Sequence, residues 1–218
     1  MLKRFLLNWI ERRKSDEIER RTDSLVKHSL KYLKEFEEQG LANVEQPDLD
    51  GWDLHRAARE NRVAIVRVLI VLGNDVDDKD NYGTTALAEA ASWNSLDVAT
   101  LLIEKGADNE AKDDKGFKYL HYAAQENSME VARLLIALGA DVNAKANEGS
   151  TALHGAAWNN SVEAARLLIE LGADINAKSN QGFTPLYLAA RKKRSFEVAR
   201  LLIDRGANTD GIDLSWMN

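Results

Sequence analysis

The sequence predicts an all-α fold built as a stack of repeated helix pairs. The first observation behind this prediction is a period of 33 residues that runs through most of the 218-residue chain. The second is that each period holds two short stretches whose apolar residues recur at helical spacing. Units that recur at this spacing cannot bury their apolar faces alone, so neighbouring units stack. Glycine marks the period at Gly83, Gly116, Gly149 and Gly182, and leucine marks it at Leu54, Leu87, Leu120, Leu153 and Leu186.

The period divides the chain into three predicted parts. Residues 1–46 lie outside the repeat and are predicted to form an N-terminal helical extension. Residues 47–208 hold five repeats, at 48–79, 80–112, 113–145, 146–178 and 179–208. Residues 209–218 are too short for another helix pair. Because this tail contains Ile212, Leu214, Trp216 and Met217, we expect it to fold back and cap the last repeat.

The N-terminal extension has one apolar stripe on an otherwise charged helix, and such a stripe needs a surface to pack against. We expect it to cap the end of the stack, which a terminal repeat requires for solubility. A protruding helix that binds a partner or a second copy is the alternative. Within it, residues 1–14 combine apolar side chains such as Trp9 with flanking basic ones, so contact with an anionic membrane surface is a further alternative.

The fourth repeat shows how the first helix of each unit is predicted to form. Thr151 is suited to the N-cap, where its hydroxyl can accept from an unpaired N–H group. In the fifth repeat the same place reads Thr184-Pro185, the preferred order of a cap and a first helical residue. Leu153, Ala156 and Ala157 share one face, and the small alanines allow neighbouring helices to approach closely.

The second helix of each unit is predicted from the residues that separate it from the first. Asn160 stands where the first helix ends, and asparagine accepts the left-handed conformation better than other non-glycine residues. Ser161 then follows and is expected to cap the second helix with its hydroxyl. Gly172 ends that helix. The same pattern places Asn61, Asn94 and Asn127, and Ser95, Ser128 and Ser195, at matching positions.

These residues resemble the ankyrin repeat family. Thr184-Pro185-Leu186, Leu153-His154 and the run from Gly172 to Ala177 are similar to the family's TPLHxAA and GADVNA signatures. The resemblance covers about residues 48–208 and implies a curved all-α solenoid of antiparallel helix pairs, with β-hairpin-like loops projecting at right angles. The sequence departs from the pattern where Lys118-Tyr119 replaces Thr-Pro and where Ala88 replaces histidine.

Composition narrows the classes of partner and compartment. The formal net charge is −6 and the isoelectric point is about 5.3, whereas nucleic-acid-binding proteins are usually basic, so no nucleic acid is expected. The chain has no cysteine, which excludes disulfides and thiolate metal sites and fits a reducing compartment. We read no signal peptide and no membrane-spanning stretch, and we therefore expect a cytoplasmic protein.

No group of residues has the pattern of a catalytic or metal site. His55, His121 and His154 occupy one repeat position, so they lie about one repeat apart and cannot converge on a metal ion. By the family resemblance this histidine bonds between adjacent loops. Asp108, Asp141 and Asp174 are likewise locked to one turn position. We expect no enzyme activity, no metal and no cofactor.

Protein binding is therefore the predicted function. The family resemblance implies a partner surface on the concave face, made of loop tips and the outward side of the first helices. Aromatic residues in these positions are expected to contribute most, because exposed aromatics concentrate interface energy. The candidate partner-binding residues are Asn81, Tyr82, Thr84, Trp93, Lys115, Phe117, Gln125, Glu126, Glu148, Ser150, Trp158, Asn159, Gln181, Phe183, Arg191 and Lys192.

Several alternatives to this prediction stay open. Trp93 and Trp158 can instead fold under their own loops, while Phe117 and Phe183, just after a turn glycine, are expected at the surface. The run from Arg191 to Arg194, which carries an extra residue, is either a solvated loop or a contact for an acidic partner. As alternatives to a general scaffold, the acidic chain can be a dedicated inhibitor, antitoxin or immunity protein for a basic toxin or enzyme, or an adaptor attached to a membrane or oligomer through its N-terminal helix.

Overall fold

The computed structural model describes residues 51–192 and 195–217. The predicted extension at residues 1–46, with its amphipathic face at residues 1–14, lies outside the described residues. The described chain forms ten α-helices and a short 3₁₀ helix, and in these residues the only β pairing is an isolated bridge between Lys79 and Thr85. The α-helices are α3 (Leu54–Arg59), α4 (Val63–Val71), α5 (Ala86–Ser92), α6 (Leu96–Glu104), α7 (Tyr119–Gln125), α8 (Met129–Ala137), α9 (Ala152–Asn159), α10 (Val162–Glu170), α11 (Pro185–Lys192) and α12 (Phe196–Asp204).

The chain divides into two compact units. One contains Ala64–Asp75 and therefore most of α4, whose buried side chains are Ile65, Val66, Val68 and Leu69. The other contains His55–Val63 and Val76–Asn218. All residues of the candidate surface belong to this second unit.

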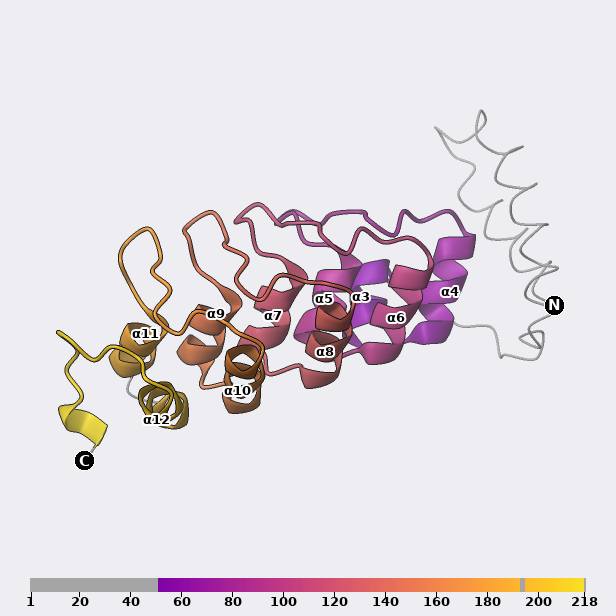
Figure 1. Cartoon of the computed structure of the whole chain (residues 1–218). Coiled ribbons are helices and arrows are strands. Elements are labelled where there is room, and N and C mark those ends of the chain that lie inside the picture. The colour runs from indigo at the N-terminus through magenta and orange to yellow at the C-terminus, as the bar shows by residue number, and fades with distance from the viewer. Residues whose placement is uncertain (1–50, 193–194, 218) are drawn as a thin grey trace. The chain divides into compact units, whose positions relative to one another are not determined.

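Within the second unit the helices form two layers (Figure 1). The first layer holds α5, α7, α9 and α11, the first helices of successive repeats, each packed on the next. The second layer holds α6, α8, α10 and α12, the second helices. Leu87, Leu153 and Leu186 of the first layer, and Leu102 and Leu202 of the second, are almost completely buried between them. The predicted all-helical stack is confirmed.

Asparagine joins each repeat to the next. Asn160 ends α9 with a φ of +57°, so its predicted left-handed conformation is confirmed. Its side chain then reaches the following repeat, where Oδ1 accepts from the N–H of Val198 at 3.1 Å and Nδ2 donates to Glu197. Asn127 does the same with the N–H of Ala164 and with Glu163. Each asparagine therefore satisfies an N–H group that the next second helix would otherwise leave unpaired.

The predicted role of the serines was wrong. Ser128, Ser161 and Ser195 stand at the N-caps of α8, α10 and α12, but none caps its helix with the hydroxyl. Each hydroxyl instead donates to a carbonyl in the preceding repeat; that of Ser161 bonds Gln125 O at 2.7 Å. The asparagine of that preceding repeat supplies the cap, so the hydroxyl is available for a second bond between repeats.

Adjacent loops are also held in register. Asp113 Oδ1 accepts from the N–H groups of Lys115 and Phe117 and closes the loop before α7. The carbonyl of Lys115 accepts from the N–H of Asn147 in the next loop at 2.9 Å. Gly116, with a φ of +79°, lies so close to Asn147 that an added Cβ would come within 2.3 Å of Oδ1. A side chain at this position would therefore push the two loops apart.

The histidines add a further connection between repeats: each lies near the start of a first helix and bonds the loop of the next repeat. His154 Nδ1 accepts from the N–H of Thr151 at 3.1 Å, so Nε2 carries the proton and donates to the carbonyl of Phe183 at 3.0 Å. His121 makes the equivalent bonds with the N–H of Lys118 and the carbonyl of Ser150. Burial lowers the pKa of both histidines, which keeps them neutral.

Ala88 lacks this histidine, and a residue of the next repeat compensates for it. The hydroxyl of Tyr119 donates to the carbonyl of Asp108 and accepts from Oγ1 of Thr85, each at 3.0 Å. Thr85 is only 2% exposed, so its hydroxyl needs a partner inside the protein. In the fourth repeat the corresponding threonine, Thr151, bonds His154 instead. The two departures from the family pattern, Ala88 and Tyr119, thus belong together.

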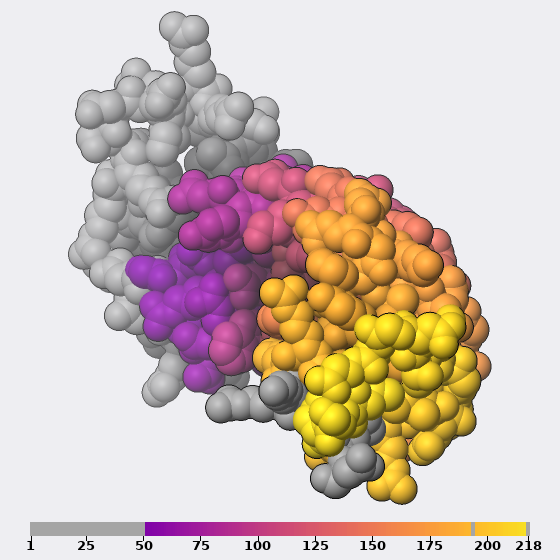
Figure 2. All heavy atoms as spheres, turned by 90° about the vertical axis from the view of Figure 1, so that its left-hand side faces the viewer, coloured from indigo at the N-terminus to yellow at the C-terminus, as the bar shows by residue number. Residues whose placement is uncertain are grey.

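The tail after α12 packs against the last repeat. Trp216 lies edge-on to Phe196 with ring centroids 6.3 Å apart, and its indole N–H donates to the carbonyl of Asp213. Asp213 Oδ1 accepts from the N–H of Ser215, the same turn that Asp113 makes. Figure 2 shows the tail, in yellow, on the surface of this end of the second unit. A capping role for the tail stays a prediction.

Replacing Tyr119 by phenylalanine should lower the free energy of unfolding by about 1–3 kcal/mol, because the buried hydroxyl of Thr85 loses its partner. Urea unfolding would measure the change. Tyr187→Phe is a matched control, since the hydroxyl of Tyr187 bonds none of the described residues. Equal stability of Tyr119→Phe and the wild type would show that the hydroxyl compensates for nothing.

The neutral histidines predict a loss of stability in mild acid. Their folded pKa is lowered below the ordinary value of 6.5, so the unfolded chain takes up protons first as the pH falls. The free energy of unfolding should therefore decrease from pH 6.5 toward about 5, before most carboxylates titrate. Replacing His121 and His154 by glutamine should flatten this part of the curve. Thermal unfolding across this pH range is the measurement, and a wild-type curve that is flat or rises on acidification would contradict the prediction.

Trp216→Ala should reduce stability by about 1 kcal/mol, the order expected for an aromatic pair. Trp93→Ala is the control, because Trp93 is 62% exposed and should contribute little to folding. Melting temperatures of the two variants compare them directly. A chain that keeps its melting temperature without Trp216 would rule out a cap formed through Phe196.

Candidate protein-binding surface

The candidate surface consists of the loop tips and of the outward side of α5, α7, α9 and α11 with the residues that follow each helix; we call it the binding surface. The structure leaves ten of the sixteen predicted residues exposed: Asn81, Tyr82, Trp93, Lys115, Glu126, Glu148, Trp158, Asn159, Gln181 and Arg191. It half-buries the other six: Thr84, Phe117, Gln125, Ser150, Phe183 and Lys192.

The exposed aromatic side chains are the most prominent feature of this surface. Tyr82 is 76% exposed, Trp93 is 62% exposed and Trp158 is 42% exposed. Tyr82 lies in the loop before α5, and Trp93 directly follows that helix. The structure therefore does not bury either tryptophan under its own loop. Large apolar side chains in this position lose contact with water only when another molecule covers them.

Phe117 and Phe183 are less available than their place after a turn glycine indicates. The ring of Phe117 packs edge-on to Tyr122 at 6.1 Å and beside His121 at 5.3 Å. Phe183 stacks on Tyr187 with centroids 4.6 Å apart and planes within 7° of parallel. Both rings thus support the helix that follows them and are half-buried.

Thr84, Ser150 and Phe183 serve the frame as well as the surface. Their carbonyl oxygens lie 2.8, 3.2 and 3.0 Å from Nε2 of a histidine one repeat earlier. The carbonyls of Gln125 and Trp158 likewise accept the serine hydroxyls of the next repeat. The backbone beneath these side chains is therefore fixed before any partner binds.

Polar side chains on three consecutive first helices form one chain of hydrogen bonds. Glu126 Oε1 accepts from Gln125 Nε2 at 3.0 Å and from Asn159 Nδ2 at 3.5 Å. Asn159 Oδ1 accepts from Lys192 Nζ at 3.3 Å. The same ammonium lies 4.9 Å from the centre of the Trp158 ring, a cation–π contact. The structure thus brings together predicted residues from repeats three, four and five.

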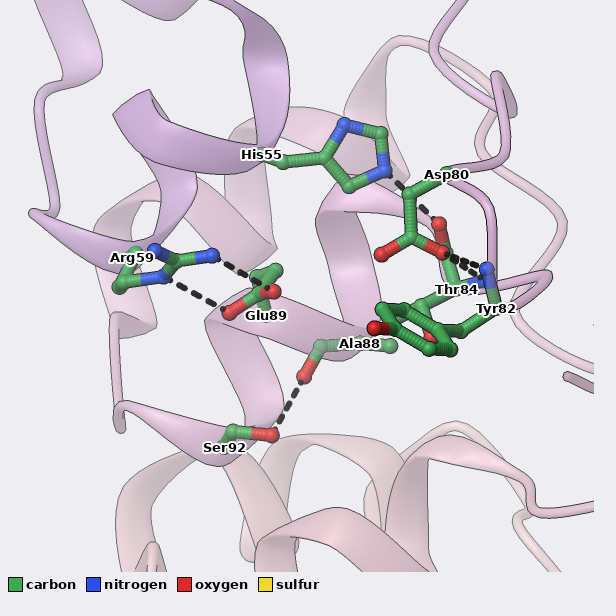
Figure 3. Close-up of polar contacts among 8 residues, drawn as sticks. All are labelled: His55, Arg59, Asp80, Tyr82, Thr84, Ala88, Glu89 and Ser92. Atoms are coloured by element: carbon green, nitrogen blue, oxygen red, sulfur yellow. Dashed lines mark hydrogen bonds and ion pairs between the residues drawn. The ribbon is translucent and has the colours of Figure 1, made fainter.

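An ion pair on the binding surface was missed by the sequence analysis. Figure 3 shows Arg59 reaching across from α3 to Glu89 of α5 with two hydrogen bonds, of 3.1 and 3.0 Å. Glu89 occupies the same place in its repeat as Tyr122, Gly155 and Leu188, a row that the prediction left out. Below the pair, Ser92 Oγ donates to the carbonyl of Ala88. The signal that could have found the pair is the opposite charge at outward helix positions of adjacent repeats, 30 residues apart.

The described part of the chain contains neither a cluster of metal-ligand side chains nor a helix of membrane-spanning length and hydropathy. No group of three or more possible ligands among His, Asp and Glu comes together in residues 51–192 and 195–217. No helix in the same residues is long and apolar enough to cross a bilayer. The fourth histidine of the chain, His28, and the face at residues 1–14 lie outside the described residues.

Comparison with known proteins agrees with the geometry. A family profile described as ankyrin repeats in three copies matches residues 26–113, 54–146 and 120–213, which together cover most of the chain. No curated protein gives a significant match to the sequence. The chain belongs to the ankyrin repeat family, whose members are generally protein–protein interaction modules and typically non-catalytic.

Proposed function

We propose that this chain is a non-catalytic binding protein that holds one protein partner on the binding surface, the face expected to be concave. The observation that carries the proposal is the set of exposed aromatic side chains, Tyr82, Trp93 and Trp158, on a framework whose backbone is already hydrogen-bonded. Aromatic residues of this kind are enriched among those that dominate binding energy at protein interfaces.

The rigidity of the framework supports the proposal. Binding costs free energy when loops and side chains must be ordered. Here the loop carrying Lys115 is tied to the next loop by its carbonyl, and the loop carrying Glu148 is tied by the N–H of Asn180. Trp158 is held beside Lys192. Little further ordering is needed, so more of the contact energy is available as affinity.

In this proposal the polar residues of the binding surface make it specific for one partner. Lys115, Glu148 and Gln181 are exposed at successive loop tips, while Glu126 and Asn159 are exposed along the first helices. Charged and polar groups of this kind favour one partner over others and guide its approach. The ankyrin fold alone does not identify the partner, because specificity depends on the side chains that the fold presents.

The more specific functions named in the sequence analysis, an inhibitor and an adaptor, remain predictions. A dedicated inhibitor of a basic toxin or enzyme would use the same surface, and the net charge of −6 favours a basic partner over the chain as a whole. An adaptor function through the N-terminal helix, and a cytoplasmic location, are likewise predictions.

The decisive variants are Trp93→Ala and Trp158→Ala. We expect each to weaken binding about tenfold or more, because an exposed tryptophan at the centre of an interface contributes more than 1.4 kcal/mol. The partner would be captured from source-cell extract with the full chain and identified by mass spectrometry, and its affinity for each variant measured by calorimetry. Leu171→Ala is the matched control, since Leu171 is 45% exposed but follows a second-layer helix.

Melting temperatures should stay close to the wild type in all three variants, because the truncated side chains are largely exposed. A partner whose affinity falls with Leu171→Ala but not with either tryptophan variant would place binding elsewhere and refute the proposal.

A further inference from the structure

Gly155 is the only glycine within a helix of the described residues. It stands in the interior of α9 without the positive φ that favours glycine elsewhere in the chain. A Cβ added there would lie 3.4 Å from Cβ of Gln125 and 3.7 Å from the carbonyl of His121, which are ordinary contacts. Glycine costs about 1 kcal/mol relative to alanine in a helix interior. Neither the backbone nor the packing of α9 therefore requires glycine at this position.

The place of Gly155 in the repeat indicates what it could serve. The corresponding residues of α5, α7 and α11 are Glu89, Tyr122 and Leu188, whose side chains are half-buried on the binding surface. Gly155 therefore leaves a position without a side chain between Tyr122 of α7 and Leu188 of α11. A departure from local preference that no structural gain offsets is expected at functional positions.

Positive charge gathers beside this position. Trp158 and Asn159 follow Gly155 by three and four residues, so they share its face of α9. Lys192 bonds Asn159 and lies over the ring of Trp158. Arg191 is exposed, and no carboxylate of the described residues forms an ion pair with either cation. The carboxylate of Glu126 bonds the other end of the Asn159 side chain, but the two cations outnumber it. The local charge is therefore opposite in sign to the net charge of the chain.

The ammonium of Lys192 is prepared for an incoming anion. It has three N–H donors, and one bonds Asn159. The ring of Trp158 holds it in place at 4.9 Å without neutralising its charge. A carboxylate that binds here gains a charge-assisted hydrogen bond, while the lysine loses little further side-chain freedom.

We propose that this end of the binding surface takes an acidic peptide segment of the protein partner. Its carboxylates contact Lys192 and Arg191, and an aliphatic or aromatic side chain beside them lies over Gly155, between Tyr122 and Leu188. The inference rests on the proposed function, whose partner it describes. The four consecutive basic residues at 191–194 form one short cluster on a chain with a net charge of −6. Such a cluster suits a short acidic segment better than a nucleic acid, which requires an extended basic stripe.

The test uses short random peptides displayed on phage and selected against the full chain, followed by affinity measurements on the synthetic winners. We expect the selected peptides to carry aspartate or glutamate next to an aliphatic or aromatic residue. Their affinity should fall about tenfold or more in the Arg191→Glu/Lys192→Glu variant and should also fall at higher ionic strength. Arg166→Glu/Arg200→Glu is the matched control, because it reverses the same number of charges at exposed cations of α10 and α12 in the second layer.

Gly155→Leu tests the apolar half of the site, and leucine already occupies the same row at Leu188. It should weaken peptide binding about tenfold or more. Gly155→Ala is the second variant and guards against misfolding: it should melt at a higher temperature than the wild type and still bind more weakly. Higher stability without any loss of affinity would overturn the role of Gly155.

The remaining outcomes separate this inference from the proposed function. Selected peptides that are basic, or acidic peptides that bind the charge-reversed variant as well as the wild type, would overturn the inference. If their binding nevertheless fell with Trp93→Ala, the proposed function would stand. Peptides that bind all surface variants equally would overturn both. A single-stranded oligonucleotide that outcompetes the selected peptides and requires Arg191 and Lys192 would overturn the peptide assignment.

Discussion

The stack depends on the asparagine at the end of the first helix in repeats one to four, which caps the second helix of the next repeat. Asn160 must adopt a left-handed backbone and also supply an acceptor to Val198. Glycine would accept the conformation but has no side chain to offer, and serine could cap but disfavours the conformation. Asparagine meets both requirements, so one residue type recurs at positions 61, 94, 127 and 160. These bonds contribute to the interface between adjacent repeats, which stabilises a one-dimensional array.

Different parts of the same residues build the stack and form its surface. The backbone groups of the loop tips form hydrogen bonds with neighbouring loops. The carbonyl of Lys115 accepts from the N–H of Asn147, and the carbonyl of Glu148 accepts from the N–H of Asn180. Their side chains remain exposed and take no part in these bonds. Substitution of such side chains can therefore change the chemistry of the surface while leaving the stack intact. Tyr82 and Trp93 are also exposed. The helix between them, α5, packs through its small buried alanines and not through these aromatic side chains.

Features that depend on neighbours in sequence were predictable, whereas those that depend on the adjacent repeat were not. The helix start at Thr184-Pro185 and the left-handed asparagines follow from local preference, and the structure confirms both. The serine hydroxyls were assigned wrongly because their partners lie 36 or 37 residues away. The pair of Thr85 with Tyr119 spans 34 residues and needed the three-dimensional register of two repeats. Exposure of Phe117 was overestimated because its ring turns back onto α7.

Two departures from the repeat now have different explanations. At Ala88 the missing histidine is balanced by Tyr119, so the change preserves the frame and carries no information about a partner. At Gly155 no neighbouring residue takes over, and the contacts around an added Cβ would be ordinary. A helix that retains glycine under these conditions gives up stability, which sequences generally do where function requires it. Ala88 is therefore explained by the packing of the stack, whereas Gly155 is not.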